Sequence, residues 1–100
     1  MLIANQLEFY NIPYRYEAAI TLGHQTKYPD FIIKKPSNGK LILWEHFGAF
    51  HQPNYVQKMN EKMNLYTKYG YIPFETIIYT FELDIRIPHR LQGLIEATLL

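Results

Sequence analysis

The sequence predicts one α/β domain in which helices cover a mixed sheet. With 100 residues, of which 48% are hydrophobic, the chain can bury a single core between two packed layers but not two separate cores. Apolar residues recur at helical spacing near both ends and once in the middle, and they alternate at strand spacing in between. The resulting order, αβββαβα, is typical of a sheet flanked by helices. We expect residues 1–100 to form this one domain.

The first element is a helix over residues 2–11. Its apolar positions share one helical face, and Asn11 followed by Pro13 supplies a stop signal. These positions are Leu2, Ile3, Leu7 and Tyr10. The helix starts without a capping residue before it, which is consistent with a fragment of a longer protein.

Three strands should follow this helix. Residues 12–21 alternate in a way that predicts a strand with one apolar face. Residues 23–27 form a polar connection, and residues 28–35 are rich in aromatic and β-branched side chains. The Pro-Ser-Asn-Gly sequence at 36–39 is a strong turn signal, so residues 40–46 should return as the second strand of a hairpin.

The second half of the chain predicts a helix, a strand and a final helix. After a loop at 48–53, an apolar stripe predicts a helix over residues 54–69 that stops at Gly70. Residues 76–82 have the composition of a strand, and Pro88 precedes the last helix. The stripe of the middle helix is Tyr55, Met59, Met63, Tyr66 and Tyr69, and that of the last is Leu91, Leu94, Ile95 and Leu99. The last stripe should pack in the core; an interface between two copies is the alternative.

Composition excludes several classes of protein. The absence of Cys excludes disulfides, thiolate zinc sites and a cysteine nucleophile. The longest apolar run is residues 41–44, far below the ~20 residues that span a bilayer, and no secretory signal is visible. We therefore expect a cytoplasmic protein with no membrane partner. The formal net charge of +1 means that any contact with nucleic acid must come from a local basic patch.

Asp30 and Glu45 are acidic residues in strands that should otherwise bury their side chains. If the four residues 36–39 form the turn, Asp30 lies directly opposite Glu45 with Cβ atoms ~5 Å apart. If Asn38 and Gly39 form a two-residue loop, Glu45 faces Ile32 instead, one step along the same face. Either loop places both carboxylates on one side of the sheet, whereas a three-residue loop would separate them.

Two carboxylates this close repel each other unless a positive charge lies between them. A divalent metal is the usual solution, and Mg²⁺, for which Mn²⁺ can substitute, prefers oxygen ligands. The sequence therefore predicts a metal site at Asp30 and Glu45. The alternative is that both side chains lie at strand ends in water.

Lys62 lies inside the apolar stripe of the middle helix rather than beside it. One explanation is that its stem covers Met59 and Tyr66 while the ammonium reaches water. The other is that the ammonium points at Asp30 and Glu45, where it could hold an attacking water or stabilise a developing oxyanion.

These segments resemble the PD-(D/E)XK nuclease superfamily, which has the restriction-endonuclease-like fold. The resemblance rests on Tyr-Pro-Asp-Phe at 28–31, Leu-Trp-Glu-His-Phe-Gly at 43–48, a helix with Tyr55, Lys62 and Tyr66, and the strand at 76–82. It covers about residues 2–82. More narrowly, the chain resembles small bacterial nuclease-like domains with PDF and WEHxG motifs, some of which are attached to DNA helicases.

The resemblance implies an αβββαβ core and Mg²⁺-dependent cleavage of DNA phosphodiester bonds. Asp30 matches the first motif and Glu45 the second acid, but Phe47 stands where the second motif would place its lysine. In some members a lysine from the following helix replaces it, and Lys62 matches that position, with Lys58 as the alternative. The implied mechanism is hydrolysis by metal-activated water; a catalytically inactive nuclease-fold module for DNA binding or interaction is the alternative. Because so small a domain lacks room for a recognition subdomain, specificity should come from a homodimer or a fused helicase-type domain.

Other residues are auxiliary candidates. The resemblance makes Glu8 the candidate for a first-helix glutamate that the family often uses near the metal. Because Glu8 lies off the apolar stripe, exposure to solvent is the alternative. His46 follows Glu45 directly and could contact phosphate or carry a proton; together with His51 it could also be read as a transition-metal ligand, although the spacing is not a zinc signature. Lysines around the hairpin, Lys27, Lys34 and Lys35 with Lys40, form a basic patch that could contact a DNA backbone. Lysine on an edge hairpin also protects against aggregation.

Overall fold

A computed structural model describes residues 2–48 and 52–100. The strands are β1 (Tyr14–Tyr16), β2 (Ile20–Leu22), β3 (Gln25–Lys27), β4 (Phe31–Lys34), β5 (Leu41–Phe47) and β6 (Ile77–Phe81). The helices are α1 (Leu2–Phe9), α2 (Pro53–Lys68), α3 (Glu82–Arg86) and α4 (Arg90–Thr98). A four-stranded sheet has the order β1-β4-β5-β6, in which only β6 runs parallel to its neighbour. The predicted α/β class with a mixed sheet flanked by helices is confirmed.

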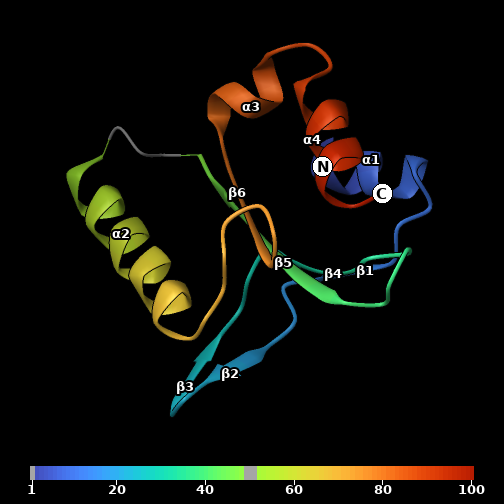
Figure 1. The fold of residues 1–100 in the computed structure, drawn as a ribbon. Coiled ribbons are helices and arrows are strands. Elements are labelled where there is room, and N and C mark those ends of the chain that lie inside the picture. The colour runs from blue at the N-terminus through green and yellow to red at the C-terminus, as the bar shows by residue number, and fades with distance from the viewer. Residues whose placement is uncertain (1, 49–51) are drawn as a thin grey trace.

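The two faces of this sheet carry different helices. Figure 1 shows α2 on one side and α1 and α4 on the other. Along β5, Ile42 and Trp44 face the cluster that contains α1 and α4, whereas Leu43 and Phe47 face the cluster that contains α2. Glu45 alternates with the latter pair and therefore points toward α2.

The hairpin between β4 and β5 has the register of the longer turn. Phe31 pairs with Trp44 and Lys34 pairs with Leu41, while the Lys35 N–H bonds the carbonyl of Lys40 at 2.8 Å. The four residues 36–39 therefore form the turn, and Gly39 takes the positive φ of 71° that the turn requires. Extending this register by one pair places Asp30 opposite Glu45, as the first of the two predicted registers had it.

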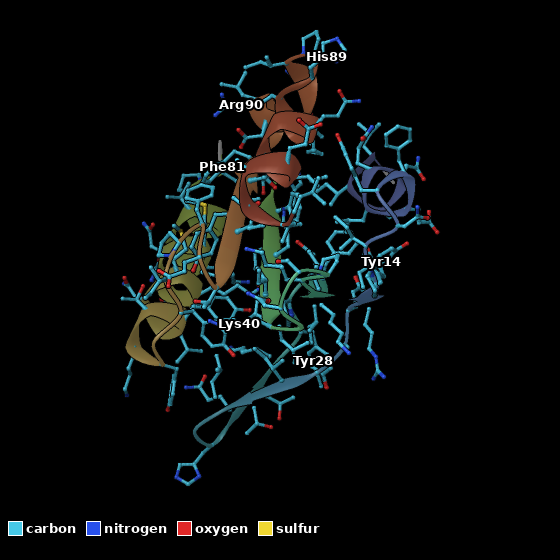
Figure 2. All side chains as sticks on the ribbon, turned by 45° about the vertical axis from the view of Figure 1, so that its right-hand side comes forward. Tyr14, Tyr28, Lys40, Phe81, His89 and Arg90 are labelled. Atoms are coloured by element: carbon cyan, nitrogen blue, oxygen red, sulfur yellow. The ribbon has the colours of Figure 1, made fainter. Side chains whose placement is uncertain are left out.

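The prediction of one strand over residues 12–21 is wrong. Only β1 joins the large sheet, because Glu17 adopts a left-handed φ of 51° and turns the chain away. Residues 23–27, predicted as a polar connection, contain a turn and β3, which pairs with β2 as a separate hairpin. Figures 1 and 2 show this hairpin projecting from the sheet, with Tyr28 at its base in Figure 2. We call it the β2–β3 arm.

The helices differ from their predicted ranges mainly at the ends. α1 stops two residues before Asn11, which takes a φ of 55°. α2 begins with Pro53 in its first turn, where a missing N–H costs nothing. α3 falls partly in the predicted strand 76–82; it is held by Asp84, whose Oδ2 accepts a 2.6 Å hydrogen bond from the Phe81 N–H.

The C-terminal apolar stripe packs within the chain. Leu91, Ile95 and Leu99 are buried in the same cluster as Ile3 and Leu7 of α1. The alternative of a free leucine-rich interface between copies is therefore wrong.

Among residues 2–48 and 52–100, no helix has the length and hydropathy needed to cross a bilayer.

Candidate functional site

Asp30 and Glu45 are tied together through the backbone of two adjacent strands. The Asp30 N–H donates to Glu45 Oε1 at 3.2 Å. In return, the N–H of His46 donates to Asp30 Oδ2 at 2.6 Å. Each acid thus accepts a hydrogen bond from the strand that carries the other. We call this reciprocal pair of hydrogen bonds the carboxylate clasp.

Lys62, on α2, forms an ion pair with Glu45. Its Nζ lies 2.7 Å from Glu45 Oε2, and its side chain keeps 33% exposure while that of Glu45 keeps 2%. The stem of Lys62 runs past the apolar stripe, but the ammonium ends at the acid rather than in open water. Of the two explanations for a lysine inside the stripe, the structure has the one in which the ammonium meets a site acid.

Tyr66 is a site residue that the sequence did not reveal. Its hydroxyl donates to Glu45 Oε2 at 2.9 Å, and the side chain is fully buried. The sequence places Tyr66 in the apolar stripe and among the helix residues that carry the family resemblance, but assigns it no role at the acids. Its position one turn after Lys62 is the signal for that role. Burial, followed by the nearby Glu45 charge, raises the pKa of Tyr66 well above its usual value. The phenol therefore stays a neutral donor.

Burial raises the pKa of Glu45 above its usual value, and the Asp30 charge adds to the effect. The Lys62 ammonium and the Tyr66 hydroxyl act in the opposite direction but do not cancel it. The fold thus holds a carboxylate in a place where its negative charge is poorly solvated. An additional cation at this position would stabilise the charged form.

The acids open into a hollow of about 270 Å³. Its lining residues come from the end of β5, the residue before β4 and residues 55–62 of α2: Asp30, Glu45, His46, Phe47, Tyr55, Lys58, Met59 and Lys62. We call this cavity the hollow. It brings both predicted acids together with Lys62, Lys58 and His46.

Phe47 occupies the position where the family pattern would place a lysine. It is buried on the α2 side of the sheet and stacks on Tyr79 with ring centroids 5.8 Å apart. Phe47 also lines the hollow beside both acids, but its side chain carries no charge. Lys62 instead delivers a cation from α2 to the same hollow.

His46 is held by a hydrogen-bonded chain beneath the hollow. Trp44 Nε1 donates to Thr80 Oγ1 at 2.9 Å, and His46 Nδ1 lies 2.9 Å from the same oxygen. The Thr80 hydroxyl accepts from the indole and can either donate to His46 Nδ1 or accept from it, according to the tautomer of the ring. The other ring nitrogen, Nε2, lies 3.8 Å from Glu82 Oε2. His51 lies outside the described residues.

The oxygens at the clasp fit a hard divalent cation. Glu45 Oε2 is occupied by Lys62 and Tyr66, and Asp30 Oδ2 by an amide. Asp30 Oδ1 accepts no hydrogen bond from the described residues, and Glu45 Oε1 accepts one, so these two atoms are the carboxylate oxygens that remain available as ligands. Residues 2–48 and 52–100 contain no group of three or more acidic, His or Cys side chains suited to a metal. Mg²⁺ is commonly held by one or two carboxylates with water in the remaining positions.

Several predicted residues lie elsewhere. Glu8 is exposed, does not line the hollow, and lies beside Tyr14, whose pKa is raised by burial and then by the Glu8 charge. The expectation that Glu8 approaches the metal acids is therefore wrong in this structure. Lys27, Lys34 and Lys35 do not line the hollow either. Lys34 shares the face of Asp30, whereas its neighbour Lys35 alternates to the other side, so the predicted basic patch is divided.

Comparison of the chain with protein-family models, with curated proteins and with solved structures gives no match in any of the three cases. The functional assignment therefore depends on the geometry of the hollow.

Proposed function

We propose that the protein is a Mg²⁺-dependent nuclease that hydrolyses DNA phosphodiester bonds. The observation that carries the proposal is the ion pair between Lys62 Nζ and Glu45 Oε2, at 2.7 Å, beside a second carboxylate held on the adjacent strand. An acid pair with a lysine from the next helix is the set of groups that metal-assisted phosphoryl hydrolysis needs. Leaving out the β2–β3 arm and the elements after β6, the chain follows the order αβββαβ. This order supports the finer assignment to the restriction-endonuclease-like fold.

In the proposed mechanism the protein contributes positioning and charge. Bound Mg²⁺ would supply an activated water and polarise the phosphate. Asp30 Oδ1 and Glu45 Oε1 would hold the ion, while Tyr66 and Lys62 fix Glu45 through its other oxygen. Since one third of the Lys62 side chain is exposed, its ammonium can also donate into the hollow. There it orients the nucleophile or stabilises the charge that develops on the phosphate.

The second candidate is a catalytically inactive nuclease-fold module that binds DNA or another partner. The observation that favours it is that Lys62 already supplies a counter-charge to Glu45. Phe47 also stands at the usual lysine position. The negative charge of the acid pair is therefore partly neutralised by the protein's own lysine. Such a site could keep its fold without turnover.

Calorimetric titration of Mn²⁺ and of Mg²⁺ separates the two candidates. Wild type and the isosteric variant Asp30→Asn are compared with Glu75→Gln, which removes an exposed acid outside the hollow. We expect binding in wild type and in the control and its loss in Asp30→Asn. If wild type binds neither ion, even with DNA present, the inactive module becomes the better description.

Cleavage assays then test the lysine. Lys62→Ala should reduce Mg²⁺-dependent cleavage of DNA by about 10²-fold or more, as for loss of a donor to a developing oxyanion. Lys68→Ala changes an exposed lysine in the last turn of the same helix and should leave the rate unchanged. Equal rates in both variants would remove Lys62 from the catalytic role.

A further inference from the structure

A second cavity lies on the same face of the sheet as the hollow. Its volume is about 500 Å³, within the range of cavities that take up small organic groups. The lining residues come from β1, β4, the start of β5, the segment before and into β2, and the stretch after α2: Pro13, Tyr14, Arg15, Ala18, Ala19, Ile20, Ile32, Lys34, Leu41, Leu43 and Tyr71. We call this cavity the groove.

The groove and the hollow are aligned by the strands that they share. Ile32 and Lys34 follow Asp30 on the same face of β4, and Leu43 precedes Glu45 on the same face of β5. At about 3.3 Å per residue, Lys34 lies ~13 Å along the strand from Asp30. A short stretch of extended polymer bound at the hollow would therefore reach the far end of the groove.

The charged residues of the groove are both cations. Arg15 pairs with Ile32 across β1 and β4, so it is the diagonal neighbour of Lys34 on the same face, about 7–8 Å away. None of the ion pairs among residues 2–48 and 52–100 includes Arg15 or Lys34. Two unpaired cations at the rim of an apolar recess are complementary to a chain that combines negative charges with flat, weakly polar groups.

We infer that the groove binds single-stranded DNA next to the bond cleaved at the hollow, with backbone phosphates at Arg15 and Lys34 and a base in the apolar recess. This inference rests on the proposed function, because the hollow defines where the strand is cut. The apolar residues that line the recess include Ile32 and Leu43, and Tyr71 is an aromatic residue among them. Unpaired bases stack on such surfaces irrespective of sequence.

The apolar character of the groove is what favours a single strand over a duplex. A duplex presents phosphates and groove edges on its outside, and a base enters a side pocket only after it has been unpaired and unstacked. A single strand can turn one base into the recess without that cost. The phosphates on either side then reach the two cations.

The test is fluorescence anisotropy in the presence of EDTA, so that no cleavage occurs. The probes are a labelled oligothymidylate of about ten nucleotides, an abasic strand of the same length, and a duplex of the same length. Wild type is compared with Arg15→Gln/Lys34→Gln and with the control Lys68→Gln/Arg86→Gln, which removes the same charge from exposed residues outside the groove.

Two results are expected. Loss of two phosphate contacts should reduce the slope of log K against log salt concentration by about 1.4 in the groove variant and by much less in the control, since each contact contributes ~0.7 for single strands. The abasic strand should bind wild type about fivefold or more weakly than the oligothymidylate, as expected when one stacked base is lost. An unchanged slope in the groove variant, absence of binding, or tighter binding of the duplex would overturn the inference.

The outcome is independent of catalysis. If Mg²⁺-dependent cleavage occurs but the groove variant binds like wild type, the groove inference fails and the nuclease proposal stands. If the groove variant loses binding as described and no cleavage is observed, the nuclease proposal fails and the groove remains a site for single-stranded DNA.

Discussion

Lys62 Nζ lies 2.7 Å from Oε2 of Glu45, an acid that is almost completely buried in the sheet. This ion pair links α2, which carries Lys62, to β5 of the sheet, which carries Glu45. The same contact connects the candidate chemistry to stability, because a buried carboxylate without a partner is costly.

Lys62→Met should destabilise the protein, and more strongly at neutral than at acidic pH. The variant keeps an apolar stem but removes the counter-charge of Glu45, so the pKa of this acid should rise further. We expect a loss of about 1–3 kcal/mol at pH 7, below the full value for breaking a buried pair because Lys62 is partly exposed. The loss should shrink at acidic pH, where Glu45 is protonated and needs no counter-charge. Urea unfolding at both pH values measures this, with Lys68→Met as the control; an equal loss at the two pH values would contradict it.

Tyr66→Phe removes one hydroxyl from the centre of the site. We expect a loss of about 1–2 kcal/mol, since Glu45 loses a buried hydrogen bond. The affinity for Mn²⁺ should fall by about tenfold or more, because Glu45 is then held less firmly. Titration calorimetry and urea unfolding measure the two effects, with Tyr28→Phe as an exposed control. A stability change without any change in metal affinity would show that Tyr66 serves packing alone.

Alkaline pH should unfold the protein through its buried phenols. Burial, and then the Glu45 charge, raises the pKa of Tyr79 to about 12, and the pKa of Tyr66 is also raised. In the unfolded chain these groups ionise near 10, so the unfolded state loses protons first as the pH increases. Their contribution to stability is therefore complete below about pH 10 and is lost as the pH rises toward 12. Unfolding free energies, followed with phenolate absorbance, should decrease between about pH 10 and 12; constant stability over this interval would contradict the prediction.

Gly23→Ala should destabilise the β2–β3 arm, whereas Gly93→Ala should stabilise the protein. Gly23 has a φ of 63°, and a methyl group there would overlap the hydroxyl of Tyr69 at the end of α2. Gly93 lies in α4, where an added methyl meets nothing within 4 Å. We expect a loss of about 1–3 kcal/mol for Gly23→Ala and a gain of about 0.5–1 kcal/mol for Gly93→Ala. Thermal unfolding of both variants measures the contrast, and shifts of the same sign would refute it.

The sequence predicted the parts of the site that follow from periodicity. The two even-length turns both placed Asp30 and Glu45 on one face, and the helical wheel singled out Lys62 because a charge inside an apolar stripe needs a partner. These features depend on the spacing of residues along the chain, which can be read directly from the sequence. The choice between the two registers could not be made, because it depends on how residues 36–39 fold.

The features that were missed depend on single backbone angles or on tertiary contacts. The alternation over 12–21 is real, but the left-handed Glu17 divides it between two sheets. Gly23 in a two-residue loop is the usual signal for a type II′ hairpin, but the polar residues around it give the pattern of a connection rather than of paired strands. The role of Tyr66 cannot be read from its stripe, since an apolar position and a buried donor look the same in sequence.

Because of the carboxylate clasp, backbone amides of the sheet can serve as probes of the candidate site. The amide protons of Asp30 and His46 each point at one acid oxygen, so their magnetic resonance signals respond to any ion or proton that takes that oxygen. An observer who watches only these two amides would detect occupation of the hollow before any substrate is known.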